Sequence, residues 1–438
     1  MESLENIIQF LKQNDELQSA KHLLKTFEKY ASNIIHYDQL GRLFYDVKAY
    51  QDAIICAERT LSLSKTTQEA YSARSNLAKL YNHVNSPHQS LIYIKSNKLI
   101  NPSDYEMKME ELFSYYLLSD FEKSYQIVIQ ILADDNAPKT VKDRCEFNHG
   151  SYLLDDNKFQ EGLKKFIGVG HEIGIWPKIN FPSIEWSGDI IPNKNIAILS
   201  EGGIGDEIIN IRFMQNIKEL GMNPIFITNR KDTSTIFNRL GFKTVKSTSM
   251  VPLDSEFVLS MFLPIKLNIS ANDLWHGPYL KPDQKYIEKW KEIFSNINGK
   301  KVALRWKGNP NYEQDLHRSI PLDILNEELD FNRSDITFIS VQKDNYEGIE
   351  KYLNIINVAD KLETLDDLMG CLYHMDHTIS SCTSVAHIAA ACGFPITVCP
   401  PVATYYTWLG NTKWYGDNCK IVRQRKWNDW SHLKGELL

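Results

Sequence analysis

The first 170 residues carry apolar anchor positions at a nearly constant spacing, and this spacing constrains the fold more than any other feature. Gly41, Ala78, Leu112 and Gly150 lie 37, 34 and 38 residues apart, close to the period of about 34 residues at which helix pairs repeat in solenoids. Between anchors, apolar residues recur every three or four positions, as in amphipathic helices. In the first copy the small Gly41 and Ala53 would let two antiparallel helices approach closely. The sequence therefore predicts a helical repeat domain over residues 1–170.

A helical solenoid presents an extended concave surface. Such a surface commonly binds a peptide, a partner protein or a polymeric substrate. The same spacing is equally compatible with a rigid spacer or a platform for dimerisation. Both interpretations stay open at this point.

The pattern changes after residue 170. Within residues 171–194 the helical pattern stops, and Pro177, Pro182, Gly188 and Pro192 predict a linker. Beyond it, short apolar runs alternate with amphipathic segments, which is typical of parallel α/β sheets. We expect two such lobes, at 195–280 and 281–438. The predicted strands are 195–199, 224–228, 242–245, 301–306, 335–341, 376–380 and 396–399, and the predicted helices are 206–220, 233–240, 283–294, 321–329, 364–372 and 384–392.

Charge and cysteine content narrow the functional classes. With 49 Lys plus Arg against 55 Asp plus Glu, the net charge is -6, so no global field draws the chain to nucleic acid or an anionic membrane. The seven cysteines are scattered without a C-x-x-C pair, no leader-like segment opens the chain, and no run of about 18 apolar residues occurs. These features predict a cytoplasmic protein without a membrane span.

A local basic cluster stands near the end of the chain. It consists of Lys420, Arg423, Arg425 and Lys426, with Trp427 and Trp430 close by. It could form a basic and aromatic surface for nucleic acid. The alternative, which we favour, is a final strand and a C-terminal helix that crosses back to the first lobe.

The turn SEGGIGDE follows the first predicted strand and precedes a helix. Gly202, Gly203 and Gly205 permit a tight turn and close backbone approach, but their spacing is not the dinucleotide fingerprint G-x-G-x-x-G. Asp206 stands at the start of the helix. It could cap that helix, or it could project into a cleft as a general base.

The segment ISSCTSVAHIAAACG places polar side chains where a strand ends and a small-residue helix begins. Cys382, Thr383 and Ser384 would converge on the positive helix end, which favours a phosphate group. His387 lies one turn further and could reach the same ligand. A lone histidine on an apolar helix is also commonly an ordinary core residue.

The segment VALRWKGNPNYEQDLHRS leads from a strand into a loop that carries Lys307, Asn309 and Arg318. Cations at the carboxyl end of a strand suit a diphosphate, and Arg offers two parallel hydrogen bonds. Solvated loop charges are the alternative. The sequence has no D-x-D motif and no His/Asp/Glu cluster with ligand spacing, so no metal and no other cofactor are expected.

Taken together, these segments resemble tetratricopeptide-repeat glycosyltransferases related to the heptosyltransferases of glycosyltransferase family 9. The resemblance covers residues from about 37 to 430. Its motifs are SYLLDDNKFQEGLKKF, EWSGDIIPNKNIAIL, GGIGDEI, LRWKGNP, HRSIPL, ISVQK, TSVAHIAAACGFPITV and WLGNTKWYGDNCKIVRQRKWNDW, of which GIGDEI and TSVAHIAAACG are the most specific. It implies a GT-B fold of two Rossmann-like lobes behind the repeats, with the acceptor lobe at 195–280 and the nucleotide-sugar donor lobe at 281–438.

The resemblance also implies roles for single residues. Asp206 matches the aspartate thought to act as catalytic base, Arg318 matches a cation that contacts the donor phosphates, and Thr383, Ser384 and His387 match the donor-binding loop and helix. One position departs from the family, because Cys382 stands where an aspartate usually precedes the Thr-Ser pair. An ADP-heptose donor is therefore not assumed.

The implied activity is an inverting, metal-independent transfer of a sugar from a nucleotide-sugar donor to an acceptor hydroxyl. The acceptor class stays open among glycan, protein and modified nucleic acid, with the repeats recruiting the acceptor or a partner. A homodimer is also compatible with the sequence. The alternative is a non-enzymatic scaffold that carries a degenerate transferase domain, for which Cys382 is the best support.

Overall fold

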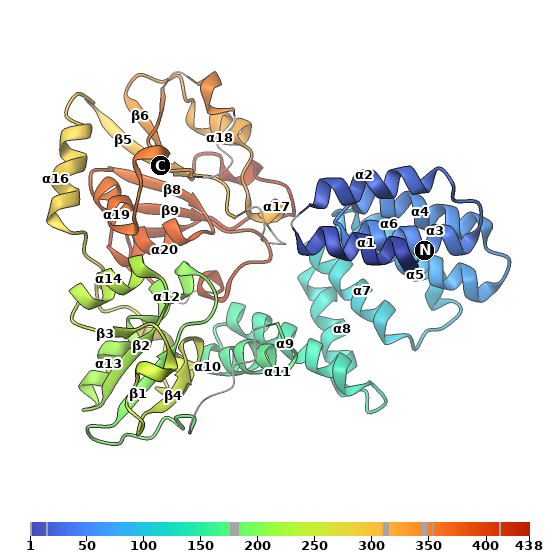
Figure 1. Ribbon diagram of the computed structural model, residues 1–438, viewed down its shortest axis with the longest axis horizontal. Coiled ribbons are helices and arrows are strands. Elements are labelled where there is room, and N and C mark those ends of the chain that lie inside the picture. The colour runs from blue at the N-terminus through green and yellow to red at the C-terminus, as the bar shows by residue number, and fades with distance from the viewer. Residues whose placement is uncertain are drawn as a thin grey trace. The chain divides into compact units, whose positions relative to one another are not determined.

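The chain forms two compact units, Met1–Cys145 and Glu146–Leu438. The computed structural model describes residues 2–14, 16–175, 184–309, 315–343, 348–352, 354–410 and 413–438, and it is shown in Figure 1. Part of the predicted linker, residues 176–183, therefore lies outside the described residues.

The first unit is built from consecutive antiparallel helices. Their bounds are α1 Glu2–Gln13, α2 Leu17–Glu28, α3 Ile34–Asp46, α4 Tyr50–Leu63, α5 Thr67–His83, α6 Pro87–Lys98, α7 Tyr105–Leu117, α8 Phe121–Ala133 and α9 Lys139–Asp155, the last of which runs into the second unit.

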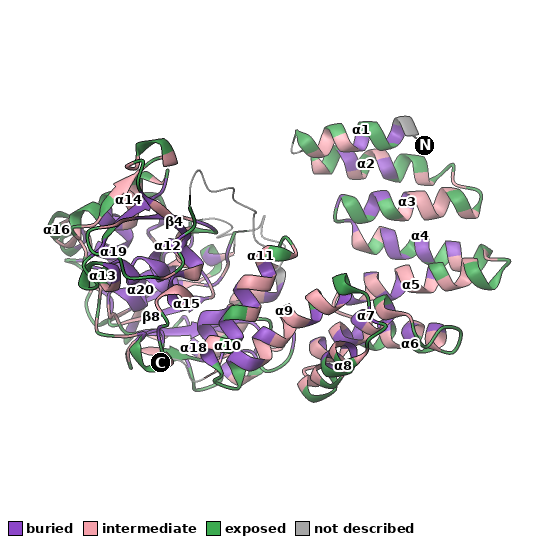
Figure 2. Cartoon of the chain, turned by 90° about the horizontal axis from the view of Figure 1, so that it is seen from below, coloured by how far each residue is buried: buried purple, intermediate pink, exposed green. Residues whose placement is uncertain are grey.

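Local signals explain where these helices begin and why they pair. Thr66 and Glu69 form a reciprocal capping box at the start of α5. A Cβ atom at Gly41 in α3 would lie 3.4 Å from Cys56 Cβ in α4, so the missing side chain allows the predicted close approach. Each helix turns one stripe of residues inward, as the alternation of buried and exposed residues along α3 to α5 shows (Figure 2).

The last helices of the predicted repeat region belong to the second unit. These are the end of α9, α10 (Phe159–Leu163), the π-helix η1 (Lys164–Val169) and α11 (Gly170–Glu172). Leu154, Phe159 and Leu163 are part of the buried cluster of the α/β lobes. The compact units therefore divide earlier than residue 170, where the sequence places the end of the repeats.

The first lobe contains a four-stranded parallel sheet in the order β3-β2-β1-β4. The helix predicted over 206–220 is interrupted at Ile211 and Arg212. The strands are β1 Asn195–Leu199, β2 Asn223–Ile227, β3 Lys243–Val245 and β4 Glu256–Leu259, and the α-helices are α12 Ile204–Asn210, α13 Phe213–Glu219, α14 Lys231–Arg239 and α15 Leu263–Lys266.

The second lobe contains a six-stranded parallel sheet in the order β10-β9-β8-β5-β6-β7. The strands are β5 Lys300–Arg305, β6 Ile336–Ser340, β7 Ile355–Asn357, β8 His377–Ser381, β9 Ile396–Cys399 and β10 Cys419–Ile421. The α-helices are α16 Gln284–Ile293, α17 Asp315–Arg318, α18 Leu322–Leu329, α19 Leu365–Tyr373 and α20 Ser384–Ala391.

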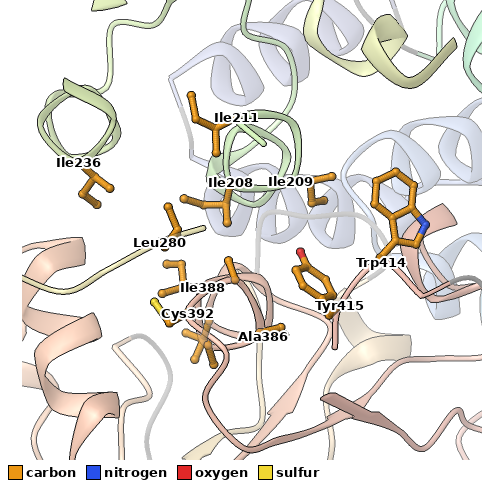
Figure 3. Packing of buried hydrophobic residues seen from close by; sticks show 14 of the residues in the cluster. Ile208, Ile209, Ile211, Ile236, Leu280, Ala386, Ile388, Cys392, Trp414 and Tyr415 are labelled. Atoms are coloured by element: carbon orange, nitrogen blue, oxygen red, sulfur yellow. The ribbon is translucent and has the colours of Figure 1, made fainter. Parts of the chain in front are cut away.

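The two lobes share one apolar cluster. Ile208 on α12 lies next to Ile388 on α20 (Figure 3). Because α12 and α20 follow the central strands β1 and β8, this packing brings the carboxyl ends of the two sheets toward each other. The predicted fold class, a helical region followed by two parallel α/β lobes, is confirmed.

The C-terminal segment differs from its prediction. No α-helix follows β10 within residues 413–438. Val422, Trp430 and Leu433 instead pack into a cluster of the second lobe. The predicted C-terminal crossing helix is therefore wrong. The crossing to the first lobe is made earlier, where Arg212 donates to the Trp414 carbonyl.

The basic and aromatic cluster near the C-terminus is mostly occupied within the fold. Trp427 and Trp430 are buried. Lys420 pairs with Glu436, and Arg423 pairs with Asp155. Buried indoles cannot stack on bases, so this segment does not form the aromatic surface that nucleic-acid binding would need.

Candidate active site

The glycine turn after β1 has the geometry that its sequence requires. Gly202 has a φ of +75°, in the left-handed region that favours glycine. Its carbonyl accepts a hydrogen bond from Arg230 Nη2 at 2.8 Å. Gly203 then adopts an extended conformation immediately before α12. The turn therefore ends with a helix N-terminus at the carboxyl edge of the sheet.

Asp206 lies in the first turn of α12, and both of its carboxylate oxygens are bonded. Oδ2 accepts from the Gly203 N–H at 2.6 Å, and Oδ1 accepts from the Tyr405 hydroxyl. The first bond is the helix-capping contact, so the capping interpretation holds. The second bond comes from the segment after β9, which ties Asp206 to the second lobe as well.

The electrostatics of Asp206 suit a base. Burial raises its pKa above 3.8, and the nearby negative charge of Glu201 raises it further. The bonds from Tyr405 and Gly203 lower the pKa in part. A carboxylate with a raised pKa takes up a proton more readily than an exposed aspartate does.

Glu207, next to Asp206, is a buried carboxylate with a fixed structural role. Its side chain is 0% exposed and forms an ion pair with Arg230 at 2.7 Å. Thr228 Oγ1 donates to the same oxygen at 2.7 Å, and Ser200 donates to it as well. Since Arg230 also donates to the Gly202 carbonyl, it connects the glycine turn to Glu207 and stabilises the turn. No local sequence pattern indicates this contact, because Arg230 lies on the next strand–helix connection.

The donor side is built around the start of α20. Thr383 is the N-cap residue of α20, and its hydroxyl lies 3.1 Å from Ser380 Oγ. Ser384 is half-buried and Cys382 precedes the cap. These residues therefore stand at the carboxyl end of β8, where the helix N-terminus favours negative charge.

Arg318 ends the short helix α17 and points to this same turn. Its Nε bonds to Asp315 Oδ1 at 2.8 Å, and its Nη1 donates to the Cys382 carbonyl at 3.2 Å. A Cβ atom at Gly308 would collide with the guanidinium, so Gly308 leaves the space that Arg318 occupies.

Lys307 and Asn309 follow β5 at the same edge of the sheet. The backbone N–H of Lys307 donates to Gln342 Oε1 at 3.0 Å, and its side chain is half-buried. Asn309 is exposed and stands next to residues 310–314, which lie outside the described residues.

His387 occupies a different place from the one the sequence predicts. It is 4% exposed, its ring stacks on Trp408 at 4.7 Å, and its Nδ1 lies 2.8 Å from the Tyr415 hydroxyl. A Cβ atom at Gly205 would lie 3.0 Å from its Cδ2. Burial lowers its pKa to about 3, with a further contribution from Arg212. His387 is therefore a neutral residue of the lobe interface at neutral pH.

Arg212 is a second interface residue that sequence reasoning missed. Its guanidinium is buried and donates to the carbonyls of Leu274 and Trp414 and to the Tyr279 hydroxyl. The Tyr415 ring lies 4.9 Å below it. The Arg212 guanidinium thus links the first lobe to residues 274–279, which lead toward the second lobe, and to the crossing segment around Trp414 and Tyr415.

The electrostatic surroundings of Cys382 show which predicted residues the fold brings together. Burial raises the pKa of its thiol, the Arg318 guanidinium lowers it, and the Asp206 carboxylate raises it. Asp206 from one lobe and Arg318 from the other therefore act on the same point between the lobes. Thr383 directly follows Cys382, whereas His387 is buried against Trp408 and Tyr415.

The described residues also bear on metal binding and on membrane crossing. No group of three or more His, Cys, Asp or Glu side chains is arranged to hold a metal ion among the described residues. No described helix has the length and apolar character needed to cross a bilayer.

Comparisons with known proteins give similarities of fold. No protein-family model matches the chain. Protein FlbA of Caulobacter vibrioides is 22% identical over 315 residues, which are 64% of this chain and 52% of that protein. The chain therefore spans about half the length of the curated relative it matches.

Two solved structures illustrate what the chain is similar to. A family 9 glycosyltransferase from Veillonella parvula is 9% identical, with 54% of this chain and 87% of that chain covered and a TM-score of 0.39. A tetratricopeptide repeat protein from Parabacteroides merdae is 19% identical, with 40% and 66% covered and a TM-score of 0.29. These are the two classes that the motifs resemble.

Proposed function

We propose that the chain is an inverting, metal-independent glycosyltransferase that moves a sugar from a nucleotide-sugar donor to an acceptor hydroxyl. The observation that carries this proposal is that Tyr405 of the second lobe donates to Asp206 of the first lobe, while Arg318 donates to the Cys382 carbonyl just before the start of α20. A base on one lobe and a cation with a helix N-terminus on the other are the groups that such a displacement needs.

Each group has a defined task in this reaction. Asp206 takes the proton of the acceptor hydroxyl as that oxygen forms a bond to the anomeric carbon. The bond from the anomeric carbon to the diphosphate oxygen breaks, and the nucleoside diphosphate leaves with the electron pair. Arg318 and the N–H groups of α20 at Thr383 and Ser384 stabilise its negative charge, with Lys307 and Asn309 at the rim.

His387 supports this arrangement from behind. As a neutral residue packed against Gly205, it sets the distance between α12 and α20. We therefore assign it an indirect part in donor binding, through the position of α20.

Cys382 determines which donor sugar fits. A thiol brings no charge next to Arg318, whereas the aspartate usual in similar sequences would add a carboxylate there. We expect Cys382→Asp to change the preferred sugar while the nucleotide preference stays the same.

The repeats recruit the acceptor or a partner in this proposal. A hollow of about 530 Å³ lined by residues of α1 and of α3 to α5 supports it, with Tyr37, Arg42, Asn76 and Lys79 among its lining residues. The seven cysteines, all of them among the described residues, form no disulfide bond, which fits a reducing, cytoplasmic location.

The experiment is a hydrolysis and thermal-shift screen of the full chain with UDP-, GDP-, ADP- and CMP-sugars. We expect at least one donor to be hydrolysed and to raise the melting temperature. Arg318→Ala should weaken the binding of that donor. Arg333→Ala should leave donor binding unchanged, because the exposed Arg333 side chain pairs with Asp335. If no donor has any effect, the transferase proposal fails and the scaffold alternative stands.

A further inference from the structure

A second acidic side chain is buried in the turn that carries Asp206. Glu201 follows β1, and it is 4% exposed. Its Oε1 accepts the Met261 N–H at 3.1 Å, and its Oε2 lies 3.5 Å from His171 Nε2. A carboxylate this deeply buried is costly unless it is paired. The reaction described above does not use it.

His171 reaches Glu201 from the helical segment in front of the α/β lobes. It follows the π-helix η1, a rare form that occurs frequently at functional sites. Its ring packs at 5.2 Å from the Phe262 ring. The distance of 3.5 Å allows an ion pair when the imidazole is protonated, and Glu201 Oε2 and His171 Nε2 have no hydrogen-bond partner among the described residues.

Contacts through Met261 connect this pair to Asp206. The Met261 N–H bonds to Glu201, and Met261 Sδ lies 3.9 Å from the Tyr405 hydroxyl. That hydroxyl donates to Asp206 Oδ1. Met261 and Tyr405 therefore connect the two carboxylates, and the negative charge of Glu201 raises the pKa of Asp206.

We propose that Glu201 is a positioning residue that sets the basicity of Asp206, and that His171 controls how much of the Glu201 charge reaches Asp206. A neutral His171 leaves the Glu201 charge uncompensated and keeps Asp206 a stronger base. A protonated His171 compensates that charge, and Asp206 becomes a weaker base. The inference rests on the proposed function only in taking Asp206 as the base.

Few other titratable groups face the two carboxylates. Tyr405 and Tyr406 approach from the segment after β9, and Cys382 approaches from the end of β8. Burial raises the pKa of each of these groups above its ordinary value, so all three are neutral near pH 7. His171 is thus the facing group whose ring nitrogen can pair with the Glu201 carboxylate.

The test is the pH profile of kcat/KM for sugar transfer by the full chain. Glu201→Gln should move the acidic limb to lower pH and His171→Gln should move it to higher pH, each by about one unit. Glu172→Gln, at an exposed neighbour of His171, should leave it in place. A purely structural role would not give opposite shifts. Shifts in the same direction, or none, would overturn the inference.

A second measurement does not depend on turnover. The carboxyl carbon of Asp206 in full-length, ¹³C-aspartate-labelled protein can be titrated by NMR and assigned by its loss in Asp206→Asn. Its midpoint should fall in Glu201→Gln and rise in His171→Gln. An unchanged midpoint overturns the inference even if transfer is observed. Shifted midpoints without any transfer would support the inference and count against the proposed function alone.

Discussion

Gly202→Ala should destabilise the α/β unit because it acts on the glycine turn and on Asp206 together. Gly202 has a φ of +75°, and its new Cβ would fall on the Asp206 carboxylate. The left-handed conformation costs an alanine about 1–2 kcal/mol. Asp206 must also leave the Gly203 N–H, and a hydrogen bond to a charged group contributes about 1.5–3 kcal/mol. We expect a loss of about 2.5–5 kcal/mol in total.

Gly221→Ala is the matched control. Gly221 has nearly the same φ, +79°, and a Cβ there would meet nothing within 4 Å. It should therefore lose only the conformational part, about 1–2 kcal/mol, and keep transferase activity. The difference between the two variants isolates the cost of displacing Asp206.

Urea unfolding followed by tryptophan fluorescence provides the assay. All nine tryptophans occur after residue 145, so the signal reports the α/β unit and not the repeats. Equal losses of stability in the two variants would refute the reasoning, since Asp206 would then not be held by the turn. Full activity in Gly202→Ala would refute it as well.

Three further predictions concern the same region. Arg230→Met leaves the Glu207 carboxylate buried without its cation and should lower the free energy of unfolding by about 3 kcal/mol. This is the low end for a broken buried pair, because Arg230 is 35% exposed. Adding Glu207→Gln should recover most of this loss in urea unfolding, and no recovery would contradict the pairing. The pKa of Asp206 is raised, so Asp206 should become protonated and kcat/KM should fall as the pH drops through a midpoint above 3.8. Tyr405→Phe removes a hydrogen bond that lowers this pKa, so the midpoint of the kcat/KM profile should be higher in this variant. A lower midpoint would contradict the role of Asp206 as the base. Gly205→Ala places a methyl group 3.0 Å from His387 Cδ2. The overpacking should cost about 1–3 kcal/mol, more than the gain of about 1 kcal/mol in helix propensity, so the melting temperature should fall. A raised melting temperature would show that the lobe interface is looser than described.

Much of the fold could be predicted from sequence because its signals are local. The run NIAIL predicts β1 over the residues that form it, and the run of small residues after Thr383 predicts α20. The strands β4 and β7 were missed, since Glu256–Leu259 and Ile355–Asn357 are each followed by a short 3-10 helix and not directly by an amphipathic α-helix that would mark a strand–helix unit. The interruption of the helix at Arg212 was missed for another reason, because it depends on contacts with the crossing segment.

The candidate site divides in the same way. Asp206, Thr383 and Arg318 were identified because each lies on the connection that follows a predicted strand, and parallel strands bring such connections to one edge. The residues that position them come from far along the chain. Tyr405 bonds to Asp206 across 199 residues, and Arg230 reaches Glu207 across 23. No local pattern encodes these contacts, nor the packing that turns His387 away from the ligand toward the lobe interface.

The most direct test of the central claim is the comparison of donor binding and turnover in Asp206→Asn, with the donor found in the screen. If Asp206 is the base, the variant should bind the donor as the wild type does and lose at least about 100-fold in kcat. Turnover equal to that of the wild type would contradict the account.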